Sequence, residues 1–338
     1  MIPENVRFAW LSPECWRSFR TAISLHSHTS HSREPLDFFP LRYRGEDAWW
    51  NPPLTPRQAW ELECGQIGSL GLYPLVSITD HDDIEAPLRL RVLQDSRHTP
   101  ISVEWSAPFE DAAFHIGVHG LPARRARECM AALAAYTFQP RADVLGDLLV
   151  WLSEQDETLV VFNHPCWDEG RLGLDRHMEL VRRFLRRFHG FIHALELNGL
   201  RPWRENLKVA ALAERAGLPL ISGGDRHGCE PNANLNLTQA RTFGEFVEEI
   251  RLDARSHILF MPQYRQSHTQ RIARIVMDVA TYGTVSARTG FRLRQNPVLC
   301  LQQSGKGSEN LRTFHGLFAL LGAGADSASP APGTTGQR

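Results

Sequence analysis

Histidine and acidic side chains follow several short apolar stretches of this chain, each at the point where the stretch ends. These residues are His26 and His28 in SLHSH, Asp80 and His81 in SITDHDD, Glu104 in SVE, His164 in VVFNHP, and Asp225 and His227 in ISGGDRH. Imidazole nitrogens and carboxylate oxygens with no thiolate nearby suit zinc, manganese or iron(II), and a carboxylate can bridge two ions about 3.5–4 Å apart. One His-x-His pair is a weak signal, but the conjunction of histidines and acids at the ends of five separate stretches favours a multinuclear hydrolytic metal centre.

His26 and His28 are two residues apart on a predicted strand. Their side chains would therefore point to the same face and could bind one ion together. Placing several carboxylates and histidines in a protein interior without a metal would leave polar groups unsatisfied and like charges close together. The metal-binding interpretation is accordingly favoured over a purely structural one.

Seven short apolar runs, rich in β-branched residues and bounded by turn residues, are predicted to be strands. They cover residues 22–28, 74–80, 100–104, 113–119, 158–163, 193–198 and 218–223. Helical patterns lie between or after them at 57–70, 123–135, 204–217, 243–254 and 268–281. Alternating strands and helices favour a parallel sheet, and in parallel barrels the C-terminal strand ends converge on the active site. The histidines and acids are therefore expected to meet in one pocket.

The ordered set of motifs resembles the PHP (polymerase and histidinol phosphatase) domain family. The motifs are SLHSHTSHS, ITDHDD, SVEWS followed by FHIG, FNHP, and GGDRH after LELNG, and they cover residues ~20–235. The resemblance implies an α/β fold, a distorted seven-stranded (β/α) barrel. It also implies a metal-dependent phosphoesterase with two or three divalent ions of zinc, manganese or iron.

The same resemblance implies ligands for three ions. They are His26, His28, Glu104 and Asp225 for the first ion, Glu104, His115 and His164 for the second, and His81 and His227 for the third. Many family members supply a further ligand to the third ion from an Asp after the serine of the first motif, where this chain has Arg33. Glu34 is the candidate in its place, with His31 behind it. Without Glu34 the centre would be dinuclear, or Arg33 would hold substrate phosphate there.

One ligand of this set has an alternative, and one further acidic residue is expected to support the ligands. His119 lies on the same predicted strand face as His115, two whole periods away, and His115 is favoured because it precedes IG in FHIG. Asp80 is expected to orient a ligand histidine, as carboxylates beside metal-bound imidazole commonly do. Together with Glu104 and Asp225 it forms the predicted catalytic acidic set.

The predicted reaction is hydrolysis of a small phosphate monoester by a hydroxide that bridges two ions. Arginines suited to holding phosphate oxygens are, in order of preference, Arg226, Arg33, Arg171 and Arg201. The alternatives are a phosphodiesterase or exonuclease that acts on short nucleic acids or on cyclic or bis-phosphate esters, and a non-catalytic binding module. Hydrolysis of a monoester compared with a bis-ester distinguishes the first two.

Charge and cysteine content narrow the class of partner. The chain has 338 residues and a net charge of −1, from 37 Lys and Arg against 38 Asp and Glu. With no excess positive charge, binding to long nucleic acid or to an anionic membrane is not expected. The six cysteines form no CxxC pair, which fits reduced thiols in the cytosol. We expect a soluble cytoplasmic protein with a small phosphorylated substrate, and the sequence carries no signal for its oligomeric state.

The chain divides into three predicted parts. Residues 1–256 are expected to form the PHP-type phosphoesterase domain, residues 257–321 a helical extension of undefined role, and residues 322–338 a disordered tail. The long insertion at 33–53 is consistent with a lid that selects the substrate and equally with a plug that caps the barrel.

Overall fold

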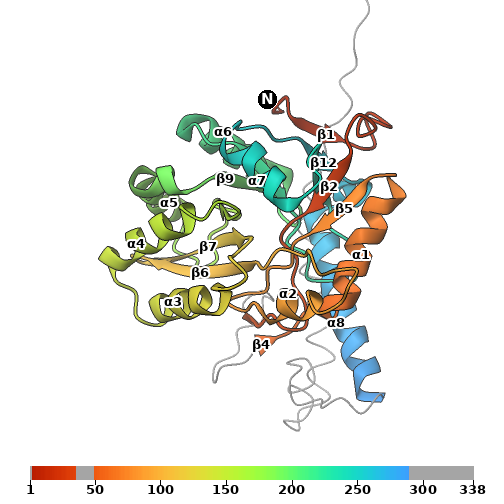
Figure 1. The fold of residues 1–338 in the computed structure, drawn as a ribbon, viewed down its shortest axis with the longest axis horizontal. Coiled ribbons are helices and arrows are strands. Elements are labelled where there is room, and N and C mark those ends of the chain that lie inside the picture. The colour runs from red at the N-terminus through yellow and green to blue at the C-terminus, as the bar shows by residue number, and fades with distance from the viewer. Residues whose placement is uncertain (1, 36–48, 289–338) are drawn as a thin grey trace, which may run out of the picture.

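The computed structural model describes residues 2–35 and 49–288 of the chain. Its framework is a pair of mixed sheets with five strands each (Figure 1). The first sheet has the order β1 (Val6–Phe8), β12 (Ile258–Phe260), β11 (Asn234–Thr238), β2 (Thr21–Ser24) and β5 (Tyr73–Val76). The second has the order β10 (Leu220–Gly223), β9 (Ala194–Asn198), β8 (Leu159–Phe162), β7 (Ala112–His119) and β6 (Val103–Phe109). A two-stranded ribbon consists of β3 (Glu34–Pro35) and β4 (Trp49–Trp50).

The sequence-based prediction of a closed seven-stranded (β/α) barrel is wrong. All seven predicted strands form, but β2 and β5 belong to the first sheet and the other five make up the second. β7 is antiparallel to β6 and β8, and β11 is antiparallel to β2 and β12. Only Glu110 and Asp111 separate β6 from β7, and so short a turn forces antiparallel pairing because a parallel crossover needs about a dozen residues. The strand pattern also overlooked β1, β11 and β12, which complete the first sheet.

Two backbone bridges join the sheets. Ser27, which follows β2, pairs in parallel with Arg226, which follows β10. His81, which follows β5, pairs in parallel with Glu104 at the start of β6. Strand ends of the first sheet therefore lie directly against the second sheet, and both bridges include or adjoin predicted metal ligands.

Eight α-helices and two short 3₁₀ helices complete the described part of the chain. They are α1 (Pro56–Ser69), α2 (Glu85–Leu90), α3 (Ala126–Phe138), α4 (Ala142–Ser153), α5 (Leu174–Phe188), η2 (His189–Phe191), α6 (Trp203–Ala216), α7 (Phe243–Arg251), η3 (Pro262–Arg265) and α8 (His268–Arg288). Among residues 2–35 and 49–288, no helix combines the length and the apolar character needed to cross a lipid bilayer.

Caps confirm three helix ends that the sequence predicted. The side chain of Thr55 accepts a hydrogen bond from the backbone N–H of Gln58 at the start of α1, and the Gln58 side chain accepts one from the Thr55 backbone. At the start of α7, Thr242 Oγ1 accepts from the Glu245 N–H. Gly217 ends α6 with a φ of +66°, a left-handed conformation that glycine adopts readily.

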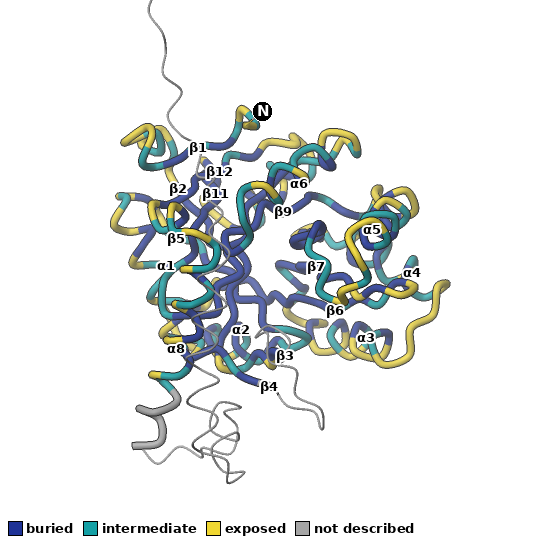
Figure 2. Tube along the Cα trace, turned by 180° about the vertical axis from the view of Figure 1, so that it is seen from behind, coloured by how far each residue is buried: buried dark blue, intermediate teal, exposed yellow. Residues whose placement is uncertain are grey.

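Aromatic side chains pack the helices onto the second sheet. Phe184 of α5 lies 5.3 Å from Phe114 of β7 and 5.0 Å from Phe162 of β8, measured between ring centroids. Burying each phenylalanine side chain contributes about 1.5–3 kcal/mol. Figure 2 shows the result, with buried strands inside and exposed residues on the outer turns of the helices. The rigid layer under β7 and β8 supports the side chains at their ends.

Residues 257–288 of the predicted extension belong to the same framework, and residues 289–321 lie outside the described residues. β12 lies between β1 and β11 in the first sheet. α8, which confirms the predicted helix at 268–281, contacts two loops: Arg271 donates to the backbone carbonyls of Gly199 and Arg201, and Asp278 Oδ2 accepts from the Cys229 N–H at 2.7 Å. These loops follow β9 and β10, so α8 supports the strand ends that carry predicted ligands. The predicted tail at 322–338 lies outside the described residues.

Stability is expected to depend on pH through His193. Its Nδ1 accepts a hydrogen bond from the Val160 N–H at 2.9 Å, and burial together with the charge of Arg251 lowers its pKa from 6.5 to about 4. The unfolded chain therefore binds the proton first, so this contribution is complete above pH ~6.5 and is lost as the pH falls toward ~4. The free energy of unfolding in urea should fall between pH 7 and pH 5, and this fall should be smaller for His193→Gln than for the unchanged protein. The exposed His98 provides a matched control, and equal losses in His193→Gln and His98→Gln would contradict the assignment.

Candidate metal centre

The nine side chains predicted as metal ligands lie in one buried cluster that both sheets contribute to. Four overlapping groups place possible ligand atoms within 4.8 Å of one another. The groups are His28, Glu34, His81 and His227; His26, His28 and Glu104; His26, His164 and Asp225; and His81, Glu104 and His115. Residues that are up to about 200 positions apart in the sequence thus meet in one place, as the convergence argument predicted.

Three of these residues have a backbone conformation that side-chain-bearing residues seldom adopt. His26, His164 and Asp225 have φ angles of 62°, 26° and 57°. Each is the second residue after its strand, which is β2, β8 or β10. Such conformations cost about 1–3 kcal/mol each and persist only where surrounding contacts hold them. Backbone strain thus recurs at equivalent positions after three strands, and all three positions belong to this cluster.

The predicted reason for the convergence of His26 and His28 is wrong in detail. β2 ends at Ser24, so neither histidine belongs to a strand, and their rings approach to 5.1 Å between centroids because the chain turns at His26. Glu104 and His115 also depart from the strand-end rule. Both lie within the antiparallel pair β6 and β7, where side chains alternate across the sheet and reach the cluster from one face.

Glu104 occupies the centre of the cluster and is fully buried. Its Oε2 lies 2.9 Å from His26 Nε2 and 3.2 Å from His28 Nε2. Its Oε1 lies 3.1 Å from His164 Nε2 and 3.4 Å from His115 Nδ1. Burial alone would raise the pKa of Glu104, but the neighbouring histidines hold it well below its ordinary value. One carboxylate therefore presents its two oxygens to two different sets of imidazoles, which is the arrangement of a bridging ligand.

Asp225 completes the set around the first two histidines. Its Oδ1 lies 3.5 Å from His26 Nε2 and 3.4 Å from His28 Nε2. Asn198, at the end of β9, donates to Asp225 Oδ2 at 3.2 Å. Burial would raise the pKa of Asp225, whereas the charges of His26 and His227 lower it.

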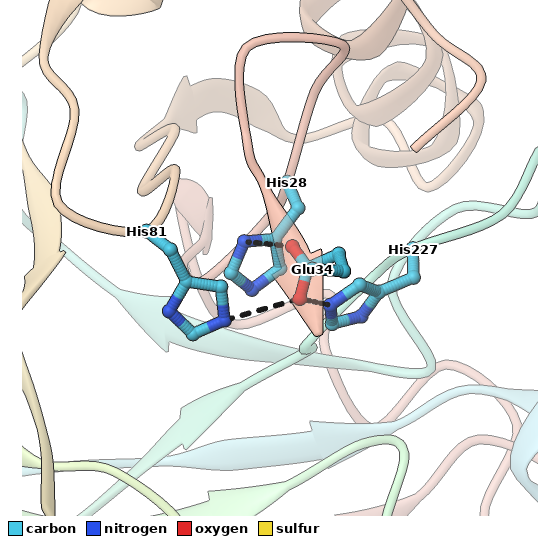
Figure 3. Close-up of side chains that lie close together, drawn as sticks. All are labelled: His28, Glu34, His81 and His227. Atoms are coloured by element: carbon cyan, nitrogen blue, oxygen red, sulfur yellow. Dashed lines mark ion pairs between the residues drawn. The ribbon is translucent and has the colours of Figure 1, made fainter. Parts of the chain in front are cut away.

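Glu34 reaches the third group (Figure 3). Its Oε2 lies 3.3 Å from both His81 Nε2 and His227 Nε2, and its Oε1 lies 3.6 Å from His28 Nδ1. The β3–β4 ribbon holds Glu34 in place, since Glu34 pairs with Trp50. The structure therefore brings together the three residues that the sequence assigned to a third ion.

Trp50 connects the insertion at 33–53 with this third group. Its side chain is fully buried, and its ring centroid lies 5.6 Å from that of His227. Asn51 Nδ2 donates to the Ser32 carbonyl at 2.5 Å, which ties the end of the insertion to its start. The described ends of the insertion thus cover one side of the cluster, and residues 36–48 lie outside the described residues.

The imidazoles are arranged as metal-binding histidines usually are, with one nitrogen held and the other directed at the ligand cluster. His26 Nδ1 contacts Glu196 Oε1 at 2.5 Å, and His227 Nδ1 contacts the Asp225 carbonyl at 2.9 Å. Two buried ring nitrogens that face Glu104, His28 Nε2 and His115 Nδ1, have no hydrogen-bond partner among the described residues. Leaving such atoms unpaired is costly. Divalent metal ions would satisfy them, so the donor set fits metals.

Two carboxylates of the site were missed by sequence reasoning. Glu196 lies within β9, is buried, holds His26 and also accepts from the His164 N–H at 2.9 Å. Its signal was available, because an acidic residue inside the apolar strand LELN requires a buried partner. Glu169 Oε2 lies 3.1 Å from His115 Nε2. In the sequence WDEG it resembles any surface loop acid, so only the structure could identify it.

His119 and Asp80 lie outside the four ligand groups. His119 Nδ1 contacts Ser77 Oγ at 2.8 Å, and burial lowers its pKa to about 3. Asp80 accepts hydrogen bonds from the Thr29 N–H at 2.5 Å and from Thr29 Oγ1 at 2.7 Å, and burial raises its pKa to about 7. Asp80 therefore anchors the residue after His28, whereas Glu196 contacts the ring of His26 and Glu169 contacts the ring of His115.

The arginines predicted to bind substrate differ in placement. Arg226 is buried, donates to the carbonyls of Gly228 at 2.8 Å and His28 at 2.7 Å, and pairs with Glu63 at 3.2 Å. These contacts give its guanidinium a structural role and do not favour contact with substrate. Arg171 is exposed in the loop after β8.

Arg201 and Arg33 lie beside the cluster. Arg201 forms a two-pronged pair with Glu205, at 2.9 and 3.1 Å, and its guanidinium lies 4.7 Å from the Trp167 ring centroid. It lines a small cavity over the ligand cluster together with Trp167 and Glu169. Arg33 lines an adjoining cleft of about 710 Å³, which His81, His115 and Glu169 also border. This volume lies within the ~300–1,000 Å³ of ordinary small-molecule sites.

Comparison with protein-family models finds no match, and comparison with curated proteins finds none either. Among solved structures the chain is similar to PsfC from Pseudomonas syringae, at 14% identity and a TM-score of 0.46 over 79% of this chain and 99% of that one. It is similar to an amidohydrolase from Chromobacterium violaceum with bound sulfate and no metal, at 18% identity and a TM-score of 0.39 over 61% and 87%. It is also similar to a candidate metal-dependent phosphoesterase from Bifidobacterium adolescentis, at 18% identity and a TM-score of 0.37 over 69% and 98%.

Replacing Glu34 with alanine should remove one bound ion and leave the others. Glu34 contributes only to the group with His28, His81 and His227, whereas the groups around Glu104 do not include it. Elemental analysis after loading with manganese and desalting measures the number of ions per chain. Glu61→Ala, at an exposed α1 position, is the control. Equal metal content in Glu34→Ala and the unchanged protein would rule out Glu34 as a ligand.

Proposed function

We propose that this protein is a metal-dependent phosphoesterase that hydrolyses the phosphate monoester of a small metabolite. The observation that supports this proposal most directly is the position of Glu104 in a buried cluster beside an open cleft. One of its oxygens faces His26 and His28, and the other faces His115 and His164. Shared carboxylates of this kind hold paired metal ions in phosphoesterases. The ordered motifs resembling the PHP family support the same reaction class, although the chain has two mixed sheets.

Zinc, manganese or iron(II) are the ions that these nitrogen and oxygen donors suit. We assign three ligand sets: Glu104 with His26, His28 and Asp225; Glu104 with His115 and His164; and Glu34 with His81 and His227. When bound, the ions supply a hydroxide nucleophile at neutral pH and neutralise charge on the phosphoryl oxygens. Glu104 holds the first two sets together, and Glu196 keeps the His26 ring oriented.

Arg201 is the residue we assign to the phosphate oxygens. Its guanidinium is held by Glu205 and lies near the Trp167 ring, so little side-chain entropy remains to be lost on binding. It borders the cavity over the ligand cluster. Arg33 borders the larger cleft, which has room for the leaving group of the ester. The phosphate would lie against the cluster, and the remainder of the substrate would extend into the cleft.

A panel of phosphate esters tests the reaction class. The purified protein, loaded in turn with manganese, zinc and iron(II), should release phosphate from monoesters and act weakly on bis-esters. Glu104→Gln should lose activity by at least about a hundredfold and lose metal, because a neutral amide bridges two cations poorly. Preferential hydrolysis of a bis-ester or short oligonucleotide would establish the phosphodiesterase alternative. Absence of hydrolysis under every metal, with metal bound, would leave the binding-module alternative.

Arg201→Ala should raise the Michaelis constant for a monoester roughly tenfold or more, since charge-assisted hydrogen bonds contribute about 1.5–3 kcal/mol. Metal content should stay unchanged, because Arg201 holds no ion. Arg183→Ala, at a surface ion pair with Glu110, is the control. An unchanged Michaelis constant in Arg201→Ala would remove Arg201 from the substrate site.

A further inference from the structure

Glu169 contacts one side of the His115 ring. Its Oε2 lies 3.1 Å from His115 Nε2, while Nδ1 on the other side lies 3.4 Å from Glu104 Oε1. His115 Nδ1 is buried and has no hydrogen-bond partner among the described residues. A neutral imidazole has one N–H and one lone pair. With Nε2–H donating to Glu169, the lone pair of Nδ1 faces His81 and Glu104, which is the orientation that a ligand to the second ion requires.

The loop that carries Glu169 is held rigidly. The Asp168 carboxylate accepts hydrogen bonds from the Leu172 N–H at 2.9 Å and the Gly173 N–H at 2.8 Å. The Trp167 N–H donates to the His164 carbonyl at 2.9 Å, which links the loop to the strand end of β8. Glu169 is therefore placed by its own loop and does not depend on contact with an ion.

The pair Glu169–His115 repeats the arrangement of Glu196–His26 at the other end of Glu104. Glu196 is buried under the site, whereas the Glu169 side chain is 28% exposed and borders the cleft. Each carboxylate contacts one nitrogen of its imidazole ring, while the other nitrogen of that ring faces Glu104. A carboxylate in that position fixes the ring orientation and raises the basicity of the ligand nitrogen.

We propose that Glu169 is a positioning residue for the second metal ion. It holds the His115 ring so that Nδ1 points toward Glu104, where that ion would bind. This inference rests on the metal centre of the proposed function and adds a residue that the ligand sets do not contain. Removing the carboxylate should weaken the binding of one ion and leave the binding of the remaining ions unchanged. Glutamine keeps an oxygen that accepts from Nε2–H, so Glu169→Gln should behave closer to the unchanged protein than Glu169→Ala.

Metal binding measured ion by ion tests this proposal without activity. Manganese titration followed by electron paramagnetic resonance, with calorimetry in parallel, should show one ion weakened about 10- to 100-fold in Glu169→Ala and less in Glu169→Gln. Glu179→Gln, at a partly exposed position of α5, is the matched control. Urea unfolding of the metal-free variants confirms that each is folded.

Unchanged metal affinities in folded Glu169→Ala would overturn the proposal, and if activity were lost at the same time, Glu169 would instead contact the substrate. Equal weakening of the binding of every ion would also overturn it. Failure of the proposed phosphoesterase activity is separate, because the metal titration still reports on Glu169 if no ester is hydrolysed.

Discussion

The buried carboxylate of Glu104 is the constraint on which the rest of the site depends. An ionised carboxylate in the protein interior is costly unless cations or hydrogen-bond donors surround it. Here five imidazoles and the amide of Asn163, which donates to Oε1 at 2.9 Å, approach its two oxygens. The histidines come from both sheets, so satisfying this one group requires the sheets to meet where they do.

The surrounding chain is shaped to allow that convergence. Gly223, the last residue of β10, passes so close to Glu196 that an added Cβ would overlap the carboxylate. Gly224 approaches Asn232 just as closely, and Asn232 in turn donates to Ser24 Oγ at 2.7 Å at the end of β2. Gly223 thus leaves room for the Glu196 carboxylate, Gly224 lets the end of β10 approach the residues after β2, where its N–H donates to the Leu25 carbonyl, and Asp225 follows in its strained conformation. Strain at the ligands is offset by these contacts.

Motif order and residue type predicted the candidate site far better than the architecture. The candidate ligands could be identified because imidazoles and carboxylates after several apolar runs are rare by chance, and Glu34 was chosen because it lies one residue after Arg33, which occupies the usual Asp position of the first motif. The barrel could not be excluded in the same way, since short strands look alike whether their neighbours are parallel or antiparallel. β6 and β7 were both recognised, but the first of these two predicted strands ended at residue 104, whereas β6 runs to Phe109, so the two-residue turn between them was not predicted.

By itself the sequence determined which residues are candidates for the chemistry and roughly where the strands and helices lie, because both depend on local composition and spacing. Only the tertiary structure decided which imidazole nitrogen faces Glu104, why Arg226 is committed to Glu63 and backbone carbonyls, and that Glu169 stands behind His115. These features depend on atoms brought together from distant parts of the chain. Their distances are set by how two sheets pack against each other, and no local pattern encodes that packing.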